Sequence, residues 1–112
     1  MNPEKQAEFQ GKQTLLYERL ADALIEATPE WWNSAVMEVE SKYEHGVISH
    51  SHSIYSEEHS KDIVEATDDI FQLTFELTEL FKQYGPIWKK AFIRVWKEAE
   101  EKWRFNITYT YD

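Results

Sequence analysis

The residues best suited to chemistry are four histidines that fall within 15 positions of one another: His45, His50, His52 and His59. In a strand, His50 and His52 share one face, with Cβ atoms about 7 Å apart because each residue advances a strand by about 3.3 Å. Two imidazoles at this spacing bind a metal when a third ligand converges on them. The candidate third ligands are Glu38, Glu57 and Glu58. An exposed strand face is the commoner explanation, and a pH-responsive surface is a further alternative.

Other catalytic patterns are missing from the sequence. Serines alternate with the histidines, but there is no G-x-S-x-G elbow, and three glycines leave few places for a strained turn. There is no phosphate-binding glycine loop, and the lack of cysteine excludes thiolate catalysis. Glu38 and Glu40 share a strand face, where a solvent-exposed role is commoner than an acid–base pair. We therefore predict a protein that is not an enzyme and needs no cofactor.

Charge is distributed unevenly along the 112 residues, which carry 21 acidic and 12 basic side chains and a net charge of −9. Residues 30–79 hold 12 acids against two lysines, whereas residues 80–104 hold seven bases against three acids. An acidic field repels phosphate backbones and anionic membranes, so neither nucleic acid nor a membrane is expected as a partner. A basic protein would be attracted. The alternative is that the charge serves solubility alone.

Hydrophobic periodicity predicts two helices and two hairpins. A helical stripe covers about residues 4–27 and ends at Thr28-Pro29, because a residue that precedes proline avoids helical geometry. Alternation predicts strands over about 35–40 and 47–55 around a turn at 42–46, in which Gly46 supplies positive φ. The longest helix is expected after a polar joint at 56–60, where Ser56 or Ser60 caps it, with Ile63 opening its apolar stripe. It should end at Gly85, a left-handed residue before proline.

A second hairpin is predicted after this helix, with a charged turn at 98–102 and a final strand over about 103–111. The order α-β-β-α-β-β indicates a single α+β domain over residues 1–112, frayed in the first ten, with an antiparallel sheet of about four strands covered by two helices. No apolar run approaches the roughly 20 residues of a membrane helix, and the first residues do not form a signal peptide. We expect a soluble, cytoplasmic protein.

Five tryptophans are many for a chain of this size. Trp31 and Trp32 are adjacent, so in an extended segment one ring must face away from the other. Trp96 lies on the strand face opposite Ile93 and Val95. Exposed tryptophan and tyrosine ringed by charge are typical of interface hot spots. The alternative is a second buried layer beneath a helix or loop.

The order of these features resembles the YezG-type immunity proteins. The resemblance covers about residues 15–112 and rests on the helix and strand of LYERLADALIEATPEWW and AVMEVE, the helix end at Tyr84-Gly85, Trp88, and the last strand FNITYTYD. Members of this family are small bacterial antitoxins that are encoded beside polymorphic toxins, typically nucleases, and are thought to act by binding them. The final strand departs from the family pattern in Thr108 and Thr110, and the final turn lacks glycine.

The resemblance and the charge together lead to the hypothesis of an immunity protein that binds a basic toxin domain, typically a nuclease. Its candidate contacts are the acids Glu38, Glu40, Glu44, Glu57 and Glu58 and the aromatic residues Trp31, Trp32 and Tyr55. A second hypothesis is an acidic, homodimeric secretion chaperone with exposed apolar grooves. A third is a metal-binding protein built on His50 and His52. The sequence leaves open whether the chain is a monomer or a homodimer.

Overall fold

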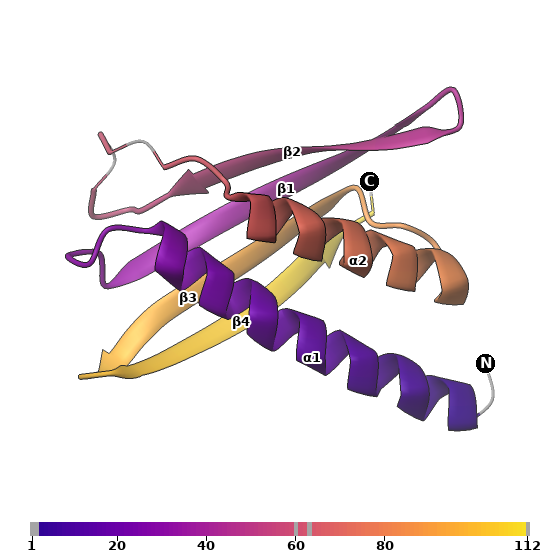
Figure 1. The fold of residues 1–112 in the computed structure, drawn as a ribbon, viewed down its shortest axis with the longest axis horizontal. Helices are drawn as coiled ribbons and strands as arrows, with labels where there is room; N and C mark the ends of the chain where they lie inside the picture. Colours follow the sequence, from indigo (N-terminus) through magenta and orange to yellow (C-terminus); the bar gives the residue numbers. More distant parts are fainter. Residues whose placement is uncertain (1–2, 60, 63, 112) are drawn as a thin grey trace.

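The computed structural model describes residues 3–59, 61–62 and 64–111 and has the predicted order of elements (Figure 1). These elements are α1 (Pro3–Ala27), β1 (Ser34–Glu44), β2 (Val47–Tyr55), α2 (Asp68–Tyr84), β3 (Lys90–Ala99) and β4 (Lys102–Thr110). The strands form one antiparallel sheet in the order β2-β1-β3-β4, and both helices cover the same face. The predicted α+β fold is confirmed. None of the described helices is long and apolar enough to cross a membrane.

The first hairpin follows the predicted alternation. β1 and β2 pair antiparallel from Glu44↔Val47 to Val36↔Tyr55. They are joined by a two-residue turn in which His45 and Gly46 have φ of 53° and 80°. The turn is shorter than the predicted 42–46, because residues 42–44 continue β1 in register with β2. Positive φ at both central residues matches the right-handed twist of the flanking strands. Ala35, Met37 and Val39 all point under the helices, as the period of two predicts.

The second helix differs from the prediction at both ends. α2 begins at Asp68 rather than near residue 60, because Thr67 adopts an extended conformation and its side chain accepts a hydrogen bond from Ile70 N. Ser56 is buried and caps no helix, while Ser60 and Ile63 lie outside the described residues. α2 has 17 residues and α1 has 25, so α2 is not the longest helix. Gly85 ends α2 in an extended conformation, with φ 162°, rather than a left-handed one.

The Thr67 cap carries a direct stability prediction. We expect Thr67→Ala to lower the free energy of unfolding by about 1 kcal/mol, because the N–H of Ile70 loses its acceptor. Thr67→Ser keeps the hydroxyl and should retain most of the stability. Urea denaturation of both variants measures the difference. An equal loss in both would contradict the capping role.

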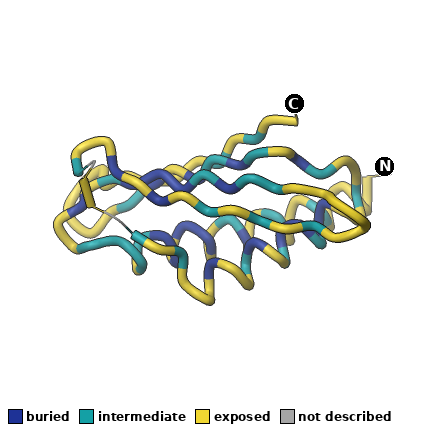
Figure 2. Tube along the Cα trace, turned by 90° about the horizontal axis from the view of Figure 1, so that it is seen from above, coloured by how far each residue is buried: buried dark blue, intermediate teal, exposed yellow. Residues whose placement is uncertain are grey.

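The core lies between the sheet and the helices, where the buried segments face one another (Figure 2). Its fully buried large side chains include Leu20, Leu24, Trp32, Met37, Ile70, Leu77, Trp88 and Ile93. Residues 1–10, for which the sequence predicts fraying, are helical from Pro3 on, and Phe9 packs edge-to-face on Phe81 with ring centroids 5.5 Å apart. The opposite face of the sheet has no covering layer among the described residues. The fold therefore presents two broad surfaces, one on the helices and one on this open sheet face.

Candidate protein-binding surfaces

The predicted contact acids on the open sheet face are already paired. Lys90 Nζ of β3 lies 3.1 Å from Glu38 Oε1 and 3.8 Å from Glu40 Oε2 of β1. A hydrogen bond and the charge of Glu38 raise the pKa of Lys90. Arg94 lies 4.0 Å from Glu57, and Arg104 pairs with Glu98. Because its acids alternate with bases, this face is nearly neutral and gives weak attraction to a basic partner.

The predicted aromatic contacts fall in different environments. Trp32 is 1% exposed, its Nε1 donates to Asp62 Oδ2 at 3.1 Å, and its ring stacks on His59. Its ring is therefore part of the core. Trp31 is 64% exposed in the α1–β1 connection. Tyr55 is exposed at the end of β2, where it pairs with Val36.

Trp96 also lies on the open sheet face. It is half-exposed and pairs with Ser34 of β1. It lines a hollow of about 130 Å³ together with Val36, Glu57 and Arg94. Glu44 is exposed at the β1–β2 turn, at the other end of the strand, and Glu58 is exposed beyond β2. The predicted contacts therefore do not form one patch.

The histidine pair lies on the covered face of the sheet, beneath α2. His50 Nε2 is 2.8 Å from Thr78 Oγ1, and His52 Nε2 is 3.0 Å from Thr74 Oγ1. Burial lowers the pKa of both rings, that of His52 to about 4, with a further contribution from His50. Burial therefore favours the neutral form of both imidazoles.

The third metal ligands proposed for this pair are not in place. Glu38 points to the opposite face of the sheet, as its contact with Lys90 requires. Among the described residues, no group of three or more histidine, cysteine or acidic side chains is arranged to hold a metal ion. The shared strand face of His50 and His52 is confirmed, but both rings are half-buried, and no carboxylate of the described residues converges on them. Its contacts are those of a structural pair.

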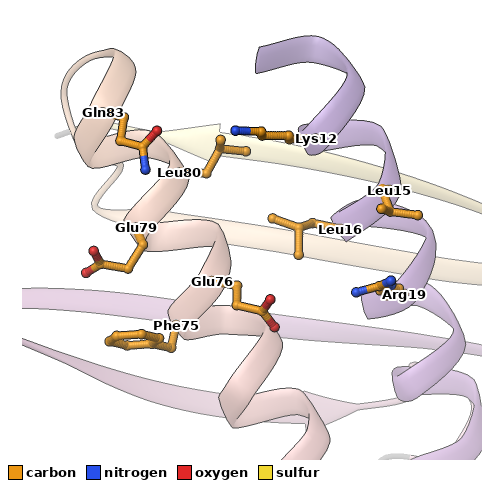
Figure 3. A pocket seen from close by; sticks show the side chains of 9 residues that line it. All are labelled: Lys12, Leu15, Leu16, Arg19, Phe75, Glu76, Glu79, Leu80 and Gln83. Atoms are coloured by element: carbon orange, nitrogen blue, oxygen red, sulfur yellow. The ribbon is translucent and has the colours of Figure 1, made fainter. Parts of the chain in front are cut away.

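A groove runs between the two helices on their outer side, and we call it the helix groove (Figure 3). Its first half encloses about 340 Å³ and is lined by Lys12, Leu15, Leu16, Arg19, Phe75, Glu76, Glu79, Leu80 and Gln83. Leu16 and Leu80 point toward each other across it, whereas Phe75 and Glu79 point away from α1. Leu15 is 50% exposed at its edge. This half has an apolar floor between charged rims.

The helix groove continues toward the end of α1 into an acidic half of about 310 Å³. Arg19 and Glu76 are common to both halves, and the new lining residues include Asp22, Glu26 and Asp69 around Ala23 and Leu73. This half has four carboxylates and one guanidinium, a balance of −3. None of the four carboxylates lies within ion-pair distance of a basic group in the described parts of the chain. Their charge is therefore available to a partner.

A larger hollow, of about 550 Å³, lies at the other end of α2 and is basic. Lys42, Lys82 and Lys89 line it beside Tyr43 and Trp88. The surface charge therefore changes sign along α2: it is negative where the helix begins and positive where the helix ends. A basic partner would be oriented toward the acidic half of the helix groove.

Sequence reasoning missed this acidic half because its residues come from segments far apart in the chain. Asp22 and Glu26 precede the segment 30–79 in which the acids were counted. A usable signal was present, since these two acids lie at i and i+4 and therefore on one face of a helix. A comparison with known protein families and with curated proteins finds no match to this chain. The resemblance to YezG-type immunity proteins therefore stays a prediction.

Proposed function

We propose that this protein is a non-enzymatic immunity protein, an antitoxin that binds and neutralises a toxin domain with a basic surface, of the nuclease type. The acidic half of the helix groove is the observation that carries the proposal. It combines carboxylates from two helices, none of which forms an ion pair within the described parts of the chain, with the apolar residues Ala23 and Leu73. Such a combination suits a basic, partly apolar protein segment better than a small polar substrate.

Electrostatics supports binding over catalysis at this surface. A nuclease must present cations to the phosphates of its substrate, so its active face attracts an acidic protein. Opposite fields steer the two proteins together and accelerate their association. Affinity then depends on apolar contacts at the centre of the interface, for which the accessible Leu15 and the partly exposed Leu73 are the candidates. An inhibitor bound in this way blocks the substrate face without chemistry.

The proposal is tested by co-expression with the toxin encoded next to this protein. We expect survival of cells that express both proteins and death of cells that express the toxin alone. The two proteins should co-purify at 50 mM salt and separate progressively as salt rises, because the Debye length falls from about 10 Å at 0.1 M to about 3 Å at 1 M. Absence of both rescue and co-purification, with a neighbour that is toxic alone, would reject the proposal.

A secretion chaperone is the second candidate, favoured by the exposed Leu15 and the apolar floor of the helix groove. A chaperone of this kind binds an unfolded segment, whereas an immunity protein binds a folded domain. Hydrogen exchange of the bound partner separates the two candidates. A partner that stays as protected as the free folded domain supports immunity, and a partner that loses protection supports the chaperone.

A further inference from the structure

β2 is an edge strand with little of the usual protection against pairing with another chain. It forms one border of the sheet, and β4 forms the other. Natural edge strands are guarded by charged residues, proline or bulges. β4 carries Lys102 and Arg104, whereas the nine residues of β2, VISHSHSIY, include no lysine, arginine, acid or proline and pair without a register shift.

The free backbone groups of this edge can be identified from the ladder. Ser41 N donates to Lys89 O at 2.8 Å on the β3 side, so the pair Ser41↔His50 is not hydrogen-bonded within the β1–β2 ladder. The N–H and C=O of His50 therefore point out of the sheet. By alternation, those of Ile48, His52 and Ile54 also point outward. Val64 makes an isolated bridge to Ile54, and in the described chain no other residue bridges this edge.

The sequence of β2 is nearly the same in both directions around Ser51. An antiparallel copy placed about this residue sets His50 against His52, Ser49 against Ser53, and Ile48 against Ile54. Only the end residues, Val47 and Tyr55, differ. The residues whose backbone N–H and C=O groups point outward are thus opposite one another, as hydrogen bonding between two copies requires. A two-fold interface requires such self-complementarity, and an unrelated partner strand does not.

α2 contributes an apolar contact on the same side. Thr74 and Thr78 contact His52 and His50, so α2 runs antiparallel to β2 and its midpoint lies near the level of Ser51. Phe75 is 54% exposed and points away from α1 (Figure 3), and it lies one helical turn after Phe71 on the same face of α2. Phe71 is 49% exposed and meets the His52 ring edge-on with centroids 5.0 Å apart. A second copy would bring the two α2 helices together at these phenylalanines.

We propose that two copies of this chain associate through antiparallel pairing of β2 about a two-fold axis at Ser51. The four-stranded sheets join into one of eight strands, with all helices on one face. Ile48 of the second copy takes the place of Val64 beside Ile54, so each chain exchanges one isolated bridge for a continuous ladder. The helix grooves lie away from the axis, on the α1 side of each α2, and stay accessible.

The test is the mass of the purified chain in solution by sedimentation velocity between 1 and 500 μM. We expect a species of twice the 13.4 kDa of one chain at high concentration. Ser51→Lys should raise the dimer dissociation constant by about tenfold or more, because two ammonium groups then face each other at the axis. Ser51 is exposed and lies opposite Glu40 on β1, so the lysine fits the single chain. Thr108→Lys, on the open face of the other edge strand, is the matched control and should leave the constant unchanged.

Amide hydrogen exchange locates the interface. In the dimer, the amides of His50 and His52 should become protected, while that of Ser51, which already bonds to β1, should be protected at every concentration. A chain that stays monomeric over the whole range would overturn the proposal. So would a dimer that Ser51→Lys leaves intact, or one in which His50 and His52 exchange freely. Pairing of β2 only after toxin is added would assign the edge to that partner instead.

Discussion

Reversing the charges of Asp22 and Glu26 together should weaken binding of the toxin domain by about a hundredfold at low salt, mainly through slower association. The double variant Asp22→Lys/Glu26→Lys changes the balance of the acidic half of the helix groove from −3 to +1. It should not harm the fold, because both positions are exposed and α1 has no basic residue in its last turn. Lysines there complement the helix dipole. Titration by surface plasmon resonance measures the loss.

The control is Glu44→Lys/Glu100→Lys, which changes the net charge by the same +4 at two exposed positions outside the helix groove, the end of β1 and the β3–β4 turn. If the helix groove binds the toxin domain, this control should lower the affinity for the toxin domain by no more than a few-fold. At 0.5 M salt the two double variants should converge, because screening removes the long-range attraction. Equal losses in both would show that net charge matters and the helix groove does not. Loss of binding only in the control would move the interface to the open face.

Local pattern was sufficient to predict that both hairpins exist, but not the length of their turns, because β1 extends to Glu44 and β3 to Ala99. The strand over 47–55 and the turn at Gly46 follow from period-two alternation and one residue free to adopt positive φ. The start of α2 was not predicted. Acids such as Asp62 and Glu65 are favourable in the first turn of a helix, so their presence suggested a helix start before the actual one at Asp68. In the structure Asp62 instead accepts the indole N–H of Trp32, and Val64 bridges to Ile54. These long-range contacts keep the segment extended until Thr67.

The surfaces were harder to predict than the elements. That one of the two adjacent tryptophans faces away was foreseeable, but which of them is buried depends on the segment around Asp62 that covers Trp32. The pairing of Glu38 with Lys90 depends on the order β2-β1-β3-β4, which the sequence did not determine. The acidic half of the helix groove joins Asp22 to Asp69, two residues that only the packing of α1 on α2 brings together. Linear charge counts therefore included Asp69 and Glu76 but missed Asp22 and Glu26, the two carboxylates that α1 contributes.

The neutral histidine pair beneath α2 should make the fold sensitive to acid. In the unfolded chain each imidazole has a pKa of about 6.5, whereas burial holds the pKa of His52 at about 4 in the folded protein. As pH falls below 6.5, protons bind to the unfolded chain first, so the stability present above pH 6.5 is lost progressively down to about pH 4. α2 presents Thr74, Thr78 and Phe71 to the pair, and none of these can stabilise an imidazolium as a carboxylate would.

We expect a loss of about 2 kcal/mol in the free energy of unfolding between pH 7.5 and pH 4.5, after allowance for solvent screening of a half-buried ring. Urea denaturation at several pH values measures it. His52→Gln keeps a polar group near Thr74 but removes the titration, so its stability should depend less on pH over this range. His45→Asn, in the exposed turn, is the control and should retain the wild-type slope. Identical pH profiles for His52→Gln and the wild type would rule out His52 as the origin of the acid sensitivity.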